Sequence, residues 1–351
     1  MLSSDPYLAF ERASDELRRQ MGIAVEHNGQ ATLYYPTEFL SEAQWQAFRT
    51  SVTSPALILT TARAKSLGLA AQHHAPIAID AIGLSLAQLQ HLADPLAGVI
   101  TLPDLSVTAA SAPAQQALQL AKQASVLPAL VTGSAITIPA DWQRISLQDL
   151  QHALTHPVID VVQTASAALP LTIAEQTRIT SFRLRHSNVV HLALIIGTPT
   201  DTPLVRVHSS CVTGDILGSL RCDCGGQLQQ ALAEIAKAGS GVLLYLHQEG
   251  RNIGITNKIR AYALQEKGID TYDANRLLGF EEDERDFSIA AALLKKLGIT
   301  QVKLLTNNPE KLAMLEQAGI KVVERIPLVT EATAHNHHYL QTKEKKAGHL
   351  F

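Results

Sequence analysis

Three cysteines lie close together in the sequence, and the chain has no others. Their spacing, Cys211-x10-Cys222-x-Cys224, is typical of a metal site, because thiolates are preferred ligands of Zn²⁺. Structural zinc sites normally use four protein ligands, whereas three ligands leave a fourth position for a water molecule. The cluster therefore favours a catalytic zinc ion that activates water as a nucleophile.

Two other interpretations of the cysteines stay open. They could be unrelated buried thiols, although Arg221, Asp223 and two glycines make the surrounding sequence a poor apolar environment. Alternatively, His208 could complete a structural Cys₃His site. That arrangement would remove the open position and weaken the interpretation as an enzyme.

Two further segments carry residues suited to an anionic substrate. HQEGRNIG, residues 247–254, lies between an apolar run and an expected helix, so Arg251 can contact a phosphate there; the alternative is an ordinary glycine-rich turn. GFEEDERDF, residues 279–287, contains five acidic residues, most of which we interpret as a solvated face. Within it, Asp283 could serve as a base and Arg285 could meet a phosphate.

A third segment, TNNPEK, follows another expected strand and opens a helix. Thr306, two amides and Lys311 around a helix N-terminus could hold a purine edge or a phosphate. The alternative, which is preferred on this segment alone, is an Asn-capped helix with proline in its first turn.

Length and charge set the frame for these segments. The 351 residues suggest two domains, and 46% hydrophobic residues provide ample material for buried cores. A net charge of −3 argues against a nucleic-acid or membrane-surface binder, but it divides into −6 over residues 1–177 and +3 over residues 178–351. We read no signal peptide and no membrane span. Three cysteines exclude a secreted disulfide scaffold, so we expect a soluble, cytoplasmic protein.

The elements that must position these residues alternate between helices and short apolar strands, which predicts an α/β fold with ligands at the loops after the strands. In the first half we expect a helix over 10–20, strands over 23–25, 31–35 and 56–60, and a short helix over 62–68. In the second half we expect strands over 179–185, 189–196, 204–208, 241–246, 302–305 and 321–323, and helices over 227–238, 255–267, 287–297 and 309–318.

These segments resemble a known family, GTP cyclohydrolase II, whose members catalyse the first step of riboflavin biosynthesis. The likeness runs from about Leu204 to Leu350, and it is carried by RVHSSCVTGDILGSLRCDCGGQL, LLYLHQEGRNIGITNKIRAYALQ, GIDTYDANRLLGF, DERDF, LLTNNPEK and HHYLQTKEKKAGHL. The resemblance implies one Zn²⁺ per chain held by Cys211, Cys222 and Cys224, and Mg²⁺ that assists release of pyrophosphate from GTP. It also implies opening of the imidazole ring with loss of C8 as formate. The product would be 2,5-diamino-6-(5-phosphoribosylamino)pyrimidin-4-one.

The resemblance also assigns roles to single residues. Asp283 matches the proposed proton acceptor, Arg285 the proposed nucleophile toward the α-phosphate, and Tyr262 a tyrosine thought to assist near the zinc-bound water. Because a guanidinium is essentially always protonated, electrostatic stabilisation of the leaving pyrophosphate is an equally good role for Arg285. The substrate contacts that match are Arg206, Val207, His208, Ser209, Ser210, Gln227, Glu249, Gly250, Arg251, Thr271, Thr306 and Lys311.

Two positions depart from the family pattern. Ser210 stands where members usually carry Glu, and His247 stands where they carry Arg. These changes could alter metal handling and weaken phosphate binding, but they leave the three thiols, Asp283 and Arg285 in place, so we expect activity. Two alternatives stay open: a variant enzyme that stops at a formamido product or uses another purine nucleotide, and a non-catalytic zinc-bearing nucleotide sensor.

The first half is similar, more distantly, to the opening of 3,4-dihydroxy-2-butanone-4-phosphate synthase, through FERASDELRRQMGIAVEHNGQATLYYP and PALILTTARAKSLGL. That family needs an acid-rich loop for Mg²⁺, and this sequence offers only Glu26 there. We therefore expect a degenerate, inactive synthase-like domain over 1–170 and a GTP cyclohydrolase II domain over 178–351. Each should be a mixed sheet with packed helices, and the resemblance suggests a homodimer. Four histidines are interpreted as surface or capping residues rather than ligands: His73, His74, His152 and His156.

Overall fold

A computed structural model describes residues 5–69, 75–157 and 159–328 of the chain. The chain divides into two compact units. The first unit is made of Met1–Val158 and Ile253–Glu284, and the second of Ile159–Asn252 and Arg285–Phe351. The sequence predicts two continuous domains, over 1–170 and 178–351, whereas by contacts Ile253–Glu284 belongs to the first unit. His73, His74 and the segment HHYLQTKEKKAGHL lie outside the described residues.

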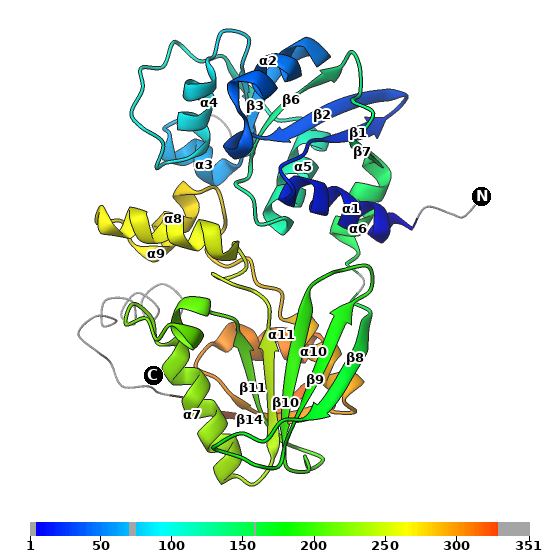
Figure 1. Cartoon of the computed structure of the whole chain (residues 1–351), viewed down its shortest axis with the longest axis vertical. Helices are drawn as coiled ribbons and strands as arrows, with labels where there is room; N and C mark the ends of the chain where they lie inside the picture. The colour runs from blue at the N-terminus through cyan, green and yellow to red at the C-terminus, as the bar shows by residue number, and fades with distance from the viewer. Residues whose placement is uncertain (1–4, 70–74, 158, 329–351) are drawn as a thin grey trace. The chain divides into compact units, whose positions relative to one another are not determined.

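The first unit is built on a seven-stranded sheet with the order β5-β4-β3-β6-β2-β1-β7 (Figure 1). Neighbouring strands are antiparallel except β1 and β7, which are parallel. The elements are α1 (Pro6–Arg18), β1 (Ile23–His27), β2 (Gln30–Pro36), a 3₁₀ turn (Thr37–Phe39), α2 (Glu42–Ser51), β3 (Val52–Leu59), α3 (Thr61–Ser66), β4 (Ile77–Asp80), α4 (Leu86–Ala93), β5 (Val107–Ala109), α5 (Ala112–Gln123), β6 (Ala129–Ala135), β7 (Gln143–Ser146), α6 (Leu147–Thr155), α8 (Gly254–Glu266) and α9 (Thr271–Leu277).

Side chains of β3 show why both faces of the first sheet are covered. Successive residues of a strand point to opposite faces. Leu57 and Leu59 pack into one apolar cluster with residues of α2 and α4, whereas Ile58 packs into another with residues of α1, α5 and α6. The strands expected over 23–25 and 31–35 form a hairpin, because β1 and β2 pair antiparallel and the turn residues Asn28 and Gly29 both have positive φ.

The second unit is built on another seven-stranded sheet, with the order β14-β13-β11-β12-β10-β9-β8. Strands β14, β13, β11 and β12 are mutually parallel, and β10, β9 and β8 continue the sheet antiparallel. The elements are β8 (Val161–Ala168), β9 (Thr177–Leu184), β10 (Val190–Ile196), β11 (Leu204–Ser209), a π-helical turn η2 (Val212–Ile216), α7 (Cys224–Lys237), β12 (Gly241–Leu246), α10 (Ser288–Lys296), β13 (Gln301–Leu305), α11 (Pro309–Gln317) and β14 (Lys321–Ile326).

The apolar strand β12 explains the layering of this unit. Leu243 packs in a cluster with residues of α7, whereas Val242 and Leu244 pack on the other face with residues of α10. A central strand buried on both faces reads as a continuous apolar run, as GVLLYL does. The predicted α/β class with two mixed sheets is therefore confirmed. Among the described residues, no helix combines the length and the apolar composition that a membrane span requires.

Candidate functional site

The three cysteines come together at the carboxyl ends of the parallel strands, where open α/β sheets bind ligands. Cys211 follows β11 and begins the turn η2, Cys222 lies in the next loop, and Cys224 begins α7. Their sulfur atoms all lie within 4.8 Å of one another, and the Sγ atoms of Cys211 and Cys222 are 3.7 Å apart. In the described part of the chain, this trio forms the group of side chains arranged to hold a metal ion.

Two glycines make room for the thiols. A Cβ atom on Gly214 would lie 2.8 Å from the Cys222 sulfur and 3.1 Å from the Cys211 sulfur. A Cβ on Gly225 would lie 2.3 Å from the carbonyl oxygen of Gly214. The Gly214 amide also donates a hydrogen bond to the Cys211 sulfur at 3.3 Å. The sequence alone gives no sign of these roles, which follow from the close approach of backbone and sulfur atoms at the cluster.

The thiols are electrostatically coupled. A hydrogen bond with Cys211, followed by burial, raises the pKa of the Cys222 thiol, while its contact with Cys224 opposes the rise. The Cys222 thiol therefore loses its proton less readily than a free cysteine, and a bound cation would favour its thiolate form. This donor set fits Zn²⁺, which is commonly bound by thiolates.

His208 does not belong to the thiol cluster. Its Nε2 lies 3.1 Å from both carboxylate oxygens of Asp215, and its ring stacks on Tyr245 with centroids 5.5 Å apart. Asp215 also accepts hydrogen bonds from the Tyr245 hydroxyl at 2.8 Å and from the Cys211 amide at 2.9 Å. Burial lowers the pKa of His208, although Asp215 opposes this. Sequence reasoning missed Asp215 and Tyr245, because their spacing gives no sign that they meet His208.

Arg206 is connected to the cysteine segment through side chains. Its guanidinium donates to the side-chain oxygen of Gln227 at 2.6 Å and to the Leu305 carbonyl at 2.9 Å. Gln227 in turn donates to Asp223, which lies between Cys222 and Cys224, at 2.6 Å. Burial lowers the pKa of Arg206 to about 10, against the opposing charge of Asp223, so the guanidinium stays charged at neutral pH.

Two of the residues between Arg206 and the first cysteine accept hydrogen bonds from neighbouring segments. The Ser210 hydroxyl accepts a hydrogen bond from the Gln248 amide at 3.2 Å, and the Val207 carbonyl accepts one from Lys311 at 3.0 Å. The buried Ser209 hydroxyl has no hydrogen-bond partner among the described residues. Ser210, one of the two departures from the family pattern, thus ties the end of β11 to the loop after β12.

The loop HQEGRNIG follows β12 and has a strained backbone. Gly250, Arg251 and Asn252 all have positive φ, which costs energy for the two non-glycine residues. The Glu249 carboxylate accepts a hydrogen bond from the Val212 amide at 2.7 Å, so this loop is tied to the turn after Cys211. Strain of this kind, next to a metal-binding group, is typical of functional sites.

The segment TNNPEK follows β13. The Asn308 side chain caps α11 by accepting from the Glu310 amide at 2.8 Å, with Pro309 in the first turn, so the predicted Asn cap is confirmed. The Thr306 hydroxyl accepts from the Asn308 amide at 3.1 Å and stabilises the same turn. Lys311 points away from this cap, because its ammonium reaches the Val207 carbonyl.

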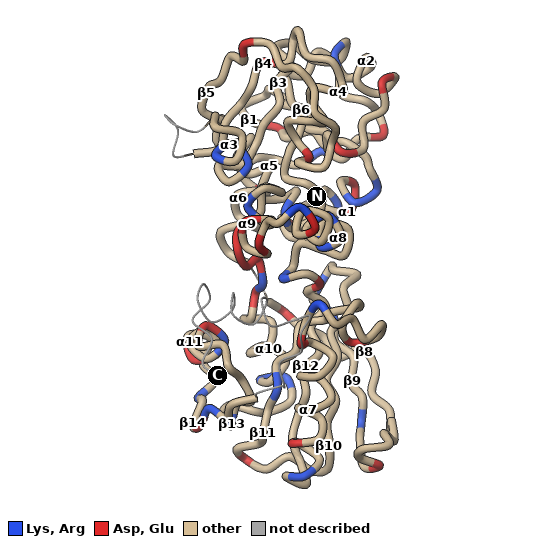
Figure 2. Tube along the Cα trace, turned by 90° about the vertical axis from the view of Figure 1, so that its left-hand side faces the viewer, with Lys and Arg blue, Asp and Glu red and all other residues tan. Residues whose placement is uncertain are grey.

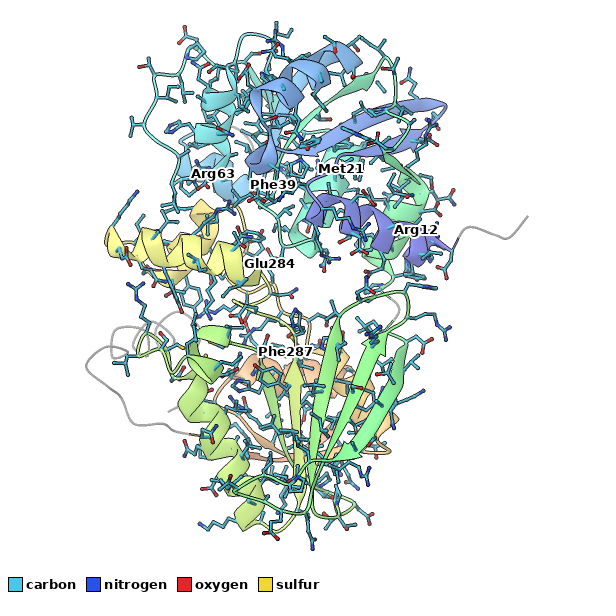
Figure 3. The ribbon with its side chains drawn as sticks, viewed as in Figure 1. Arg12, Met21, Phe39, Arg63, Glu284 and Phe287 are labelled. Atoms are coloured by element: carbon cyan, nitrogen blue, oxygen red, sulfur yellow. The ribbon has the colours of Figure 1, made fainter. Side chains whose placement is uncertain are left out.

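Two of the predicted cations lie over one aromatic ring, that of Phe287, which is labelled in Figure 3. The Arg285 guanidinium lies 4.9 Å from the centre of the Phe287 ring, and the Lys311 ammonium lies 5.0 Å from it. Phe287 itself is buried at 2% exposure, so its ring is a fixed surface for both charges. Sequence reasoning misses Phe287, because its position predicts only the start of a helix.

Three predicted site residues belong to the first unit and are described with it. Tyr262 lies on α8 with the Lys258 ammonium 5.9 Å from its ring centre. Thr271 begins α9, and its hydroxyl accepts from Gln265 at 3.1 Å. Asp283 lies in the loop after α9.

Of the four histidines interpreted as surface or capping residues, His152 and His156 are described, and both are exposed. His156 ends α6, and the rings of His152 and His156 stack on each other with centroids 5.0 Å apart.

Comparison with known proteins gives consistent matches. A sequence model of the family described as GTP cyclohydrolase II matches residues 162–327. A GTP cyclohydrolase-2 from Azospirillum brasilense is 42% identical over 361 residues, covering 98% of this chain and 94% of the relative. One from Cronobacter sakazakii is 59% identical over 162 residues, covering 46% of this chain and 82% of the relative.

Solved structures give weaker matches. A two-domain 3,4-dihydroxy-2-butanone 4-phosphate synthase from A. baumannii is 16% identical with a TM-score of 0.32, covering 85% of this chain and 93% of that one. A synthase of Candida albicans is 17% identical with a TM-score of 0.28, covering 42% of this chain and 90% of that one. Both scores are too low to establish a shared fold.

Proposed function

The chain belongs to the GTP cyclohydrolase II family, and we propose that it hydrolyses GTP in riboflavin biosynthesis as a zinc enzyme. The proposed reaction opens the imidazole ring of GTP and releases formate and pyrophosphate. The proposed product is 2,5-diamino-6-(5-phosphoribosylamino)pyrimidin-4-one. The observation that carries this proposal is the cluster of three thiols between the end of β11 and the start of α7.

The donor set supports zinc rather than a harder cation. Three sulfur ligands suit Zn²⁺, whereas Mg²⁺ prefers oxygen ligands and would enter with the phosphates of GTP. Zinc bound by Cys211, Cys222 and Cys224 would supply a Lewis acid that activates water for attack on C8. The room that Gly214 leaves beside two of the sulfur atoms supports the same assignment.

The side chains of this protein would bind and orient the nucleotide. Arg251 is placed on a loop tied to the turn after Cys211, which suits a contact with phosphate. Arg285 and Lys311, held on the Phe287 ring, would offset the charge of the leaving pyrophosphate. We propose Asp283 as the proton acceptor, with Tyr262 assisting. The proposed set of substrate contacts is completed by Arg206, Val207, His208, Ser209, Ser210, Gln227, Glu249, Gly250, Thr271 and Thr306.

The test is a single assay on purified, zinc-loaded protein with GTP and Mg²⁺. Formate, pyrophosphate and the absorbance of the pyrimidine are followed together, and all three should appear. No turnover with zinc bound would refute the proposal and favour a nucleotide sensor. Formate retained in the product would instead indicate a variant that stops at the formamido stage.

The zinc assignment has its own test. Cys222→Ser should abolish ring opening and lower the zinc content, because it removes one of three ligands. A variant of this kind with full activity would contradict the assignment.

For the first unit we propose that synthase activity is absent. Glu26, the acid expected in place of a magnesium-binding loop, forms an exposed ion pair with Arg144 at 3.3 Å, which supports a structural role. Incubation with ribulose 5-phosphate and Mg²⁺ should give no butanone phosphate, and detection of that product would overturn this proposal. We further propose that the protein is cytoplasmic and forms a homodimer. Light scattering of the purified protein would test the dimer by its molar mass.

A further inference from the structure

The segment 253–284 carries three of the proposed site residues, yet it folds as part of the first unit. Its helices α8 and α9, yellow in Figure 1, lie beside elements that are far earlier in the sequence, such as α3. Tyr262, Thr271 and Asp283 therefore rest on packing supplied by residues 5–157. Apolar packing, hydrogen bonds and ion pairs within that unit hold the segment in place.

An apolar cluster and a buried arginine anchor the helices of the segment. Leu127 packs in one cluster with side chains of α8, α9 and the loops around them. The buried Arg63, labelled in Figure 3, donates to the Leu277 carbonyl at the end of α9 at 3.2 Å and to the Leu92 carbonyl at 2.8 Å. The hydroxyl of Thr60 donates to the Gly279 carbonyl at 2.8 Å. Cations and donors at a helix C-terminus satisfy carbonyls that the helix leaves open.

Polar contacts also hold α8 to the rest of the first unit. The side-chain amide of Asn257 donates to the Ser125 carbonyl at 2.9 Å. The Arg260 guanidinium lies 2.7 Å from the Glu38 carboxylate and 3.3 Å from that of Asp94. Glu38 is 3% exposed and Arg260 is 19% exposed, so this pair is shielded from water and holds a defined geometry.

Beyond α9 the segment becomes an acidic loop (Figure 2). One lysine of the first unit meets this loop: the Lys122 ammonium lies 2.9 Å from the Glu284 carboxylate and 3.1 Å from that of Glu281. The Glu284 carboxylate also accepts a hydrogen bond from the Glu281 amide at 2.8 Å, which closes the loop on itself. Lys122 is 4% exposed and Glu284 is 16% exposed, whereas Glu281 is 68% exposed. The contact with Glu284 is therefore the better shielded of the two.

Glu284, labelled in Figure 3, stands between Asp283 and Arg285 in the chain. Fixing its carboxylate therefore fixes the backbone from which both proposed catalytic side chains extend. We propose that Lys122 is a positioning residue for GTP hydrolysis, and that the first unit serves the cyclohydrolase by holding the loop with Asp283. This inference rests on the proposed function and gives the first unit a role that requires no chemistry of its own.

The test compares Lys122→Met with the conservative Lys122→Arg and with Lys65→Met, a matched control at an exposed lysine of α3. Zinc content, thermal stability, kcat, KM and amide hydrogen exchange over residues 279–287 are measured for each. Lys122→Met should lower kcat by about 10- to 100-fold, because small misplacements of reacting groups carry costs of that size. KM should change by less than about twofold, because the loss falls on the reacting step. Exchange over the loop should rise, and Lys122→Arg should restore most of the rate.

A second variant covers the case in which Lys122→Met folds poorly. Glu284→Gln removes the partner charge while keeping its shape, and it should lower kcat in the same way. Because both substitutions break one contact, the double variant should be no worse than the more impaired single one.

The outcomes separate this inference from the proposed function. Wild-type kcat in a folded Lys122→Met variant, or a loss matched by Lys65→Met, would overturn the inference and leave the function standing. A loss of rate that is proportional to a loss of bound zinc or of folded protein would also overturn the inference, since that would be a structural effect. An inactive wild-type protein with zinc bound would refute the proposed function itself, and the inference with it.

Discussion

Replacement of Gly214 by alanine tests whether the thiol cluster is shaped for a metal ion. The added Cβ would lie 2.8 Å from the Cys222 sulfur, and ordinary contact begins at 3.4 Å. The Cys222 sulfur would therefore have to move by at least about 0.6 Å, and the Cys211 sulfur, at 3.1 Å, by about 0.3 Å. Gly214 does not have a positive φ, so the change adds bulk without backbone strain.

The magnitude follows from how little a zinc site tolerates. Ligand distances are held to within about 0.2 Å, and loss of a supporting group lowers metal affinity by about 10- to 100-fold. We expect Gly214→Ala to weaken zinc binding by at least about tenfold, or about 1.4 kcal/mol. Titration against a chromophoric chelator would measure this, together with the zinc content of the purified protein.

The control is Gly83→Ala, where a Cβ meets open space and φ is not positive. This variant should bind zinc as the wild type does. If Gly214→Ala also bound zinc within about twofold of the wild type, the cluster would have more room than its geometry indicates, and the reasoning would be refuted.

Two further predictions concern the second unit. Phe287→Leu should lower kcat/KM for GTP by roughly tenfold with zinc content unchanged, because Arg285 and Lys311 lose their shared ring. The control Phe182→Leu, in the same core, should lose as much stability and keep the wild-type kcat/KM. Equal kcat/KM values for the two variants would contradict the role of the Phe287 ring. Burial, aided by the charge of a nearby histidine, lowers the pKa of His191 to about 4, so folding favours its neutral form. Stability should therefore fall as pH drops from about 6.5 to 4, by up to about 3 kcal/mol, and His191→Asn should flatten this dependence in thermal unfolding; an unchanged slope would exclude His191 as the cause.

Periodicity was sufficient for the elements whose burial alternates clearly. The strand β12 lies at Gly241–Leu246, as its apolar run predicts, and α7 buries the face that its helical spacing indicates. In contrast, β8 (Val161–Ala168) was missed, because seven of its eight residues are exposed and leave no apolar pattern. The short polar helix α9 was missed for a similar reason, since an Asp270 cap and packing against α3 hold it rather than its own propensity.

The candidate site divides in the same way. Spacing along the chain was enough to suggest that the three thiols meet, because they lie within fourteen positions of one another. The contact between Lys122 and Glu284 joins residues 162 positions apart, and only the folded chain reveals it. Gly214 was likewise silent, because a glycine in sequence carries no sign of what its missing Cβ would meet.

The interleaving of the two units also governs the order in which the protein is made. Residues 5–157 leave the ribosome first, but the unit that they begin lacks α8 and α9 until Glu284 has been synthesised. The strands β8 to β12 of the second unit are synthesised after residues 5–157 and before α8 and α9. Since domains generally fold as units during synthesis, neither one can be completed before the other has begun. A nascent chain stalled just before Ile253 would thus expose the apolar side chains, Leu127 among them, that the inserted helices cover.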